Sequence, residues 1–92
     1  MKDTAATIHD LVEILKGSGA KTVYLFGSAA KGTMRENSDL DLAVSGLPPE
    51  NFFRALSVAS NLLDRSIHLI DLDEVTPFTR YLIEEGELQR VG

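Results

Sequence analysis

Apolar residues recur along the chain at two spacings, one typical of helices and one typical of strands. Residues 8–15 place Ile8, Leu11, Val12 and Leu15 on one helical face before Gly17, which predicts a first amphipathic helix. The same spacing runs from Glu50 to Leu63 and again from Pro77 to Glu85. The chain therefore has the pattern of three amphipathic helices.

Three shorter runs, rich in β-branched residues and leucine, predict strands. They extend from Lys21 to Phe26, from Asp39 to about Ser45 and from Ser66 to Leu72. The first run is apolar at successive positions, so we expect it to lie in the interior of the sheet. The resulting order is α-β-β-α-β-α, and the fold class is α/β (α+β), with a small mixed sheet packed against helices.

The composition narrows the functional classes. With 92 residues, of which 43% are hydrophobic, the chain forms a single domain over residues 1–92. It contains no cysteine, which excludes disulfides and thiolate metal sites. No apolar run reaches the length of a membrane span and no signal sequence is evident, so we expect a cytoplasmic protein. The net charge of −5 argues against non-specific binding of nucleic acid.

The stretch between the first two predicted strands carries the candidate chemistry. Gly27-Ser28 ends the first strand with small residues whose backbone N–H groups suit an anion. Asp39 and Asp41 follow in the second strand with one residue between them, so both carboxylates point to the same face. Oxygen ligands of this kind suit a hard divalent cation. A metal–nucleotide site is indicated, although a solvated acidic strand and a Ser28 helix cap are the alternatives from residues alone.

Gly27-Ser28, ten intervening residues and Asp39-Leu40-Asp41 together match the signature of the DNA polymerase β-like nucleotidyltransferase superfamily. The length and the order of elements resemble its minimal nucleotidyltransferases, which are often paired with HEPN proteins as toxin–antitoxin systems. The resemblance implies that Gly27 and Ser28 hold the β- and γ-phosphates of ATP or another NTP. It also implies that Asp39 and Asp41 hold Mg²⁺, or Mn²⁺, and are catalytic.

Three further residues are candidates within this resemblance. Lys31 and Arg35 would contact the triphosphate, or are solvated loop cations. His68 stands in the third strand at the position where the family usually has a third carboxylate. Imidazole is a poorer ligand for Mg²⁺ than carboxylate, so His68 either weakens transfer or acts as the base that activates the acceptor hydroxyl. Asp71 could replace the missing carboxylate only across a bulge or at a strand end, because it faces away from His68 in a regular strand.

The resemblance leaves more than one function open. The leading hypothesis is a nucleotidyltransferase that transfers NMP to a hydroxyl of a partner protein. The expected nucleotide is AMP, taken from ATP, and the expected acceptor is a tyrosine of a HEPN-type helical protein. The alternative is a catalytically weakened NTP-binding module that neutralises such a partner by contact, and a third is modification of a small alcohol such as an aminoglycoside. We also expect a homodimer or a HEPN complex to cover large apolar residues, among them Phe52, Phe53, Phe78 and Tyr81.

Overall fold

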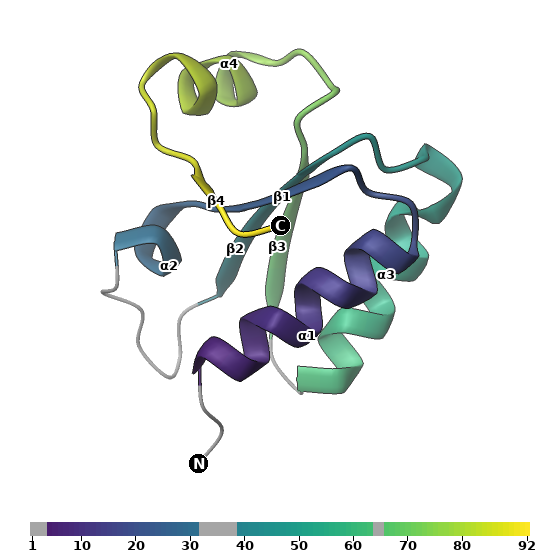
Figure 1. Cartoon of the computed structure of the whole chain (residues 1–92). Coiled ribbons are helices and arrows are strands. Elements are labelled where there is room, and N and C mark those ends of the chain that lie inside the picture. The colour runs from purple at the N-terminus through teal and green to yellow at the C-terminus, as the bar shows by residue number, and fades with distance from the viewer. Residues whose placement is uncertain (1–3, 32–38, 64–65) are drawn as a thin grey trace.

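The computed structural model describes residues 4–31, 39–63 and 66–92, which form helices and strands in alternation (Figure 1). In chain order these are α1 (Thr4–Gly17), β1 (Thr22–Leu25), α2 (Gly27–Lys31), β2 (Leu40–Ser45), α3 (Pro49–Leu63), β3 (Ile67–Asp71), α4 (Pro77–Glu84) and β4 (Gln89–Arg90). The predicted mixed α/β class is confirmed, and the three predicted helices and three predicted strands are all present. Two short elements, α2 and β4, were not predicted from the sequence.

The strands form one mixed sheet in the order β3-β2-β1-β4. Strand β1 pairs antiparallel with both β2 and β4, whereas β2 and β3 run parallel because α3 connects them. Strand β1 is thus flanked on both sides, as its apolar sequence predicted. The ladder between β2 and β3 pairs five successive residues of each strand without a bulge, so side chains alternate regularly between the two faces of the sheet.

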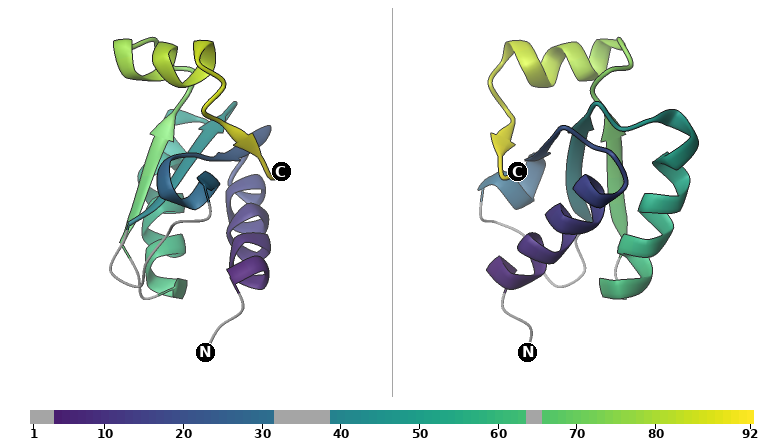
Figure 2. Two further views of the ribbon diagram at one scale, coloured as in Figure 1. Left: turned by 90° about the vertical axis from the view of Figure 1, so that its left-hand side faces the viewer. Right: turned by 45° about the vertical axis from the view of Figure 1, so that its right-hand side comes forward.

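One face of the sheet carries the main core. Helices α1 and α3 lie together on the same side of the sheet in Figures 1 and 2. Their inward residues and the alternate residues of the strands are almost completely buried, and full burial of each large aliphatic side chain is worth about 1.5–3 kcal/mol. The buried members are Leu11, Leu15, Ala20, Val23, Leu25, Leu40, Leu42, Val44, Leu47, Ala55, Ala59 and Leu69.

The opposite face is covered in part by α4, which lies across the sheet from α1 and α3 (Figure 1). Here Leu82 of α4 packs with Phe26 and Ala43 in a second, smaller core. The predicted start of α4 is confirmed: Thr76 caps the helix in a capping box with Thr79, and proline follows at the first helical position. This small cluster leaves room on the same face for polar side chains nearer the start of β2.

Several large apolar side chains remain at the surface, as the sequence led us to expect. Phe53 is 77% exposed, Tyr81 is 51% exposed and Phe78 is 45% exposed. Phe52 differs, because it is half-buried and packs against the main core. Among the described residues, no helix combines the length and the apolar character needed to cross a membrane.

Candidate active site

Asp41 and His68 come together on the face of the sheet that α4 covers only in part. Asp41 is the second residue of β2 and His68 the second of β3, and the parallel register pairs them directly. The Nδ1 atom of His68 lies 3.3 Å from Oδ1 of Asp41. The Asp41 side chain is 22% exposed and the His68 side chain 53% exposed. The two residues therefore form a polar pair that is anchored by the sheet and open to solvent.

The His68 ring also contacts Phe26, which in turn contacts Phe78 of α4. Its centroid lies 5.7 Å from that of Phe26, with the ring planes at 66°. Phe26 in turn lies 5.9 Å from Phe78 of α4, again edge to face. Such edge-to-face contacts favour one ring orientation. The imidazole is thus oriented by a buried phenylalanine while its Nδ1 faces Asp41.

Gly27 brings the backbone at the start of α2 against the Asp41 carboxylate. Its φ of +62° lies in the left-handed region, and a Cβ atom at this position would overlap Oδ2 of Asp41. The preceding N–H, that of Phe26, donates to the Asp41 carbonyl oxygen at 3.2 Å and continues the β1–β2 ladder. Glycine is therefore required here for two reasons: the backbone conformation and the close approach of Asp41.

Asp39 lies immediately before β2 and is exposed. It is two residues from Asp41, so an extended backbone would direct both side chains to the same face. Its carboxylate does not complete a compact cluster, since ligand atoms from Asp39, Asp41 and His68 do not all lie within 4.8 Å of one another. The structure thus brings Asp41 and His68 together and does not bring Asp39 into a compact group with them.

The other predicted site residues do not join the Asp41–His68 pair by any contact that the structure describes. Ser28 belongs to the five-residue helix α2, which begins at Gly27, and Lys31 is exposed at the end of that helix. Arg35 lies outside the described residues. Asp71 cannot substitute for a carboxylate at His68, because it pairs with Val44 three positions along an unbulged ladder and faces the other side of the sheet. Its Oδ1 instead accepts a hydrogen bond from the N–H of Asp73.

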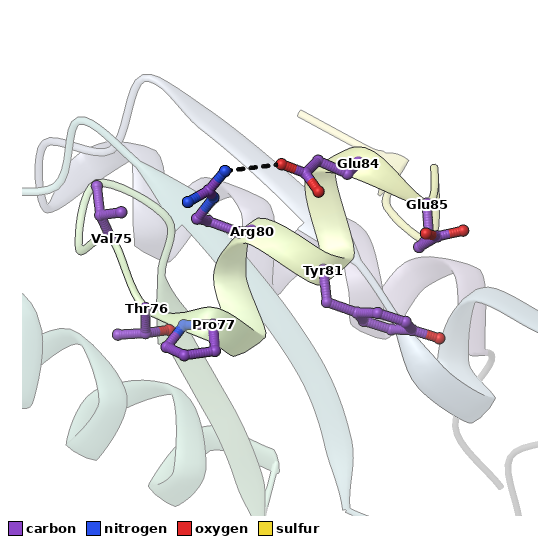
Figure 3. Close-up of a pocket in the computed structure, with 7 residues that line it drawn as sticks. All are labelled: Val75, Thr76, Pro77, Arg80, Tyr81, Glu84 and Glu85. Carbon is purple, nitrogen blue, oxygen red and sulfur yellow. Dashed lines mark hydrogen bonds and ion pairs between the residues drawn. The ribbon is translucent and has the colours of Figure 1, made fainter.

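Two other features were not predicted from the sequence. His9, Asp10 and Glu13 on α1 bring three potential ligand atoms within 4.8 Å of one another, and all three residues are exposed. The spacing of His9 and Glu13, one helical turn apart, was the available signal. The second feature is an open cavity of about 460 Å³ along α4, lined by residues that include Tyr81 and Arg80. Figure 3 shows Arg80 reaching Glu84 while Tyr81 extends away from both.

The donors at the Asp41–His68 pair fit a divalent cation. Asp41 offers carboxylate oxygens beside the imidazole nitrogen of His68, and the exposed Asp39 offers a further carboxylate two residues away in the chain. Carboxylate and imidazole are standard protein ligands for such ions. The adjoining backbone at Gly27 carries no side chain that would block a ligand bound beside Asp41. The arrangement is therefore able to hold a metal ion together with an anionic group.

Comparisons with known proteins agree with this geometry. The model of the polymerase β nucleotidyltransferase family matches residues 9–88, and the chain belongs to this family. No curated protein sequence matches the chain significantly.

Solved structures share the fold at low sequence identity. A minimal nucleotidyltransferase has 24% identity and a TM-score of 0.75, with 96% of this chain and 90% of that chain covered. A toxin–antitoxin structure with AMP-PNP has 22% identity and a TM-score of 0.75, covering 96% and 72%. A structure of tri-AMPylated Shewanella oneidensis HEPN toxin in complex with MNT antitoxin has 18% identity and a TM-score of 0.70, covering 94% and 69%. At these identities the likeness establishes the fold.

Proposed function

We propose that this chain binds a metal–NTP complex and transfers NMP, with AMP from ATP as the favoured case, to a hydroxyl group of a partner protein of the HEPN type. The observation that carries the proposal is the Asp41 carboxylate set between the start of α2 and His68. Family membership supplies the reaction class. A toxin–antitoxin structure that shares the fold was solved with AMP-PNP, which supports a nucleotide as the ligand.

Each residue has a distinct role in this proposal. Asp41 and Asp39 hold the divalent cation, which when bound neutralises charge on the triphosphate and favours deprotonation of the attacking hydroxyl. Gly27 and Ser28 receive the β- and γ-phosphates at the start of α2, and Lys31 and Arg35 are the cations proposed to contact the triphosphate. His68 orients Asp41 from the neighbouring strand. The acceptor oxygen bonds to the α-phosphorus, the bond to the pyrophosphate oxygen breaks, and the hydroxyl proton is released.

A protein acceptor is supported by the surface around α4. Phe78 continues the aromatic contacts that orient His68, and Tyr81 and Ile83 extend the exposed apolar surface along the same helix. Exposed apolar patches of this kind often mark protein interfaces. One structural relative is a complex of an MNT antitoxin with a tri-AMPylated HEPN toxin. These observations favour a helical protein partner presented beside the site.

A second function is favoured by one specific residue. His68 supplies nitrogen where a carboxylate would supply a charged oxygen, which weakens support for Mg²⁺. In that case the chain would bind NTP and neutralise its partner by contact, without transfer.

Incubation of the protein with ATP, a divalent cation and a HEPN-type partner protein, followed by intact-mass measurement of that partner, separates the two functions. Transfer predicts a mass increase of one adenylyl group (AMP less one water), lost with Asp41→Asn and retained with Asp71→Asn, whose side chain lies on the other face of the sheet. Complex formation without any adduct would favour the contact function. Neither an adduct nor a complex would contradict both.

A further inference from the structure

Asp41 and His68 bring one carboxylate oxygen and one imidazole nitrogen next to each other. They are paired in register on adjacent strands, and their nearest donor atoms, Oδ1 and Nδ1, are 3.3 Å apart. Backbone hydrogen bonds of the β2–β3 ladder fix both Cα positions, so the sheet keeps the two side chains adjacent. A mixed pair of this kind distinguishes between cations by ligand chemistry.

We propose that Asp41 and His68 form a mixed carboxylate–imidazole metal site that selects a transition-metal ion of the Co²⁺ or Zn²⁺ class over Mg²⁺. The inference rests on the proposed function in one respect, since both place a divalent cation at Asp41. Imidazole suits zinc and its transition-metal neighbours, whereas Mg²⁺ takes oxygen ligands and keeps several waters. The nitrogen of His68 is therefore the selective element of the pair.

The distance of 3.3 Å between Oδ1 of Asp41 and Nδ1 of His68 is that of a long hydrogen bond between the two side chains, so an ion bound to both atoms would take the place of this bond. The Phe26 ring, edge-on to the imidazole, keeps His68 beside Asp41.

The remaining coordination positions have ready donors. Asp39, two residues before Asp41, is exposed and offers a further carboxylate, directly or through a bridging water. His68 is 53% exposed, so solvent or an anionic ligand has access from outside. An open position of this kind is what a metal site needs in order to bind a phosphate-containing ligand. The pair thus serves as two ligands of an incomplete site, not as a closed structural centre.

Direct metal titration tests the inference without any turnover. His9 must first be replaced, because His9, Asp10 and Glu13 form an exposed group on α1 that can compete for the same ions. In a His9→Ala background, Co²⁺ binding followed by its visible absorption and Mg²⁺ binding followed by calorimetry give an affinity ratio. We expect His68→Ala to lower Co²⁺ affinity at least about tenfold and to change Mg²⁺ affinity little. Loss of a group that supports a metal site commonly has an effect of this size.

Two matched variants of His68 complete the experiment. Asn at this position keeps an N–H donor for Asp41 but no imidazole, so His68→Asn should lose Co²⁺ preference as His68→Ala does. His68→Asp should raise Mg²⁺ affinity relative to Co²⁺ by supplying an oxygen ligand. If His68→Asn keeps the wild-type affinity ratio, or if all three variants do, His68 only hydrogen-bonds Asp41 and the inference is overturned.

The same samples separate this inference from the proposed function. Binding of a non-hydrolysable ATP analogue is measured in parallel, with each ion and in each variant. Nucleotide binding that depends on Asp41 but shows no His68-dependent ion preference would leave the proposed function intact and overturn the inference. A His68-dependent Co²⁺ site in a protein that binds no nucleotide would do the reverse.

Discussion

Replacement of Gly27 by alanine tests whether the start of α2 and Asp41 form one site. The φ of +62° costs a residue with a Cβ about 1–2 kcal/mol. The new methyl group would also overlap Oδ2 of Asp41, so the carboxylate must rotate away from its contact with His68. An exposed pair of this kind is worth at most about 1 kcal/mol, so the effect on stability stays modest. The effect on ligand binding should be large, because Asp41 is displaced.

Gly86 provides the matched control. Its φ is +65°, nearly that of Gly27, but a Cβ there meets no atom within 4 Å. Gly86→Ala and Gly27→Ala should therefore lower the melting temperature by similar amounts, roughly 4–8 °C for each kcal/mol in a domain of this size. Only Gly27→Ala should weaken binding of a metal–ATP analogue, by tenfold or more, which corresponds to about 1.4 kcal/mol. Equal nucleotide affinity in both variants, by calorimetry, would refute the contact between Gly27 and Asp41 as part of the site.

Three further predictions concern the core, the capping of α4 and the partner surface. Leu42→Ala should cost about 2–5 kcal/mol in urea unfolding because this residue is fully buried, and a cost below 1 kcal/mol would contradict the assigned core. Thr79→Val should cost about 1–3 kcal/mol, since the buried hydroxyl donates to the Glu74 carbonyl oxygen; an unchanged urea midpoint would argue against that bond. Ile83→Ser should weaken partner binding by surface plasmon resonance while Val58→Ser, on α3, should not, and equal effects would exclude α4 as the interface.

Sequence patterns were sufficient for the elements that have a repeated apolar face. Helices α1, α3 and α4 bury residues at three- and four-residue spacing, and residues of the strands point alternately into and out of the core. The Thr76-Pro77 pair marked the start of α4 correctly because capping chemistry is local. Elements built from such local rules can be read without knowledge of the fold.

Other elements depend on contacts between residues that are far apart in the sequence. Helix α2 has five residues, too few for a helical period. Strand β4 has two exposed residues and exists because it pairs with β1, with Val91 N–H donating to the Val23 carbonyl oxygen. The pairing of Asp41 with His68 is of the same kind, since the whole of α3 separates β2 from β3 in the sequence and their register is set by packing. The family signature, not periodicity, pointed to that pair.

The most direct test of the central claim is calorimetric binding of a non-hydrolysable ATP analogue in the presence of Mg²⁺ or Co²⁺. The wild type is compared with Asp41→Asn and with Asp71→Asn, two aspartates of adjacent strands that face opposite sides of the sheet. We predict metal-dependent binding that is lost with Asp41→Asn and kept with Asp71→Asn. Binding that survives Asp41→Asn, or that disappears equally in both variants, would contradict a nucleotide site at Asp41.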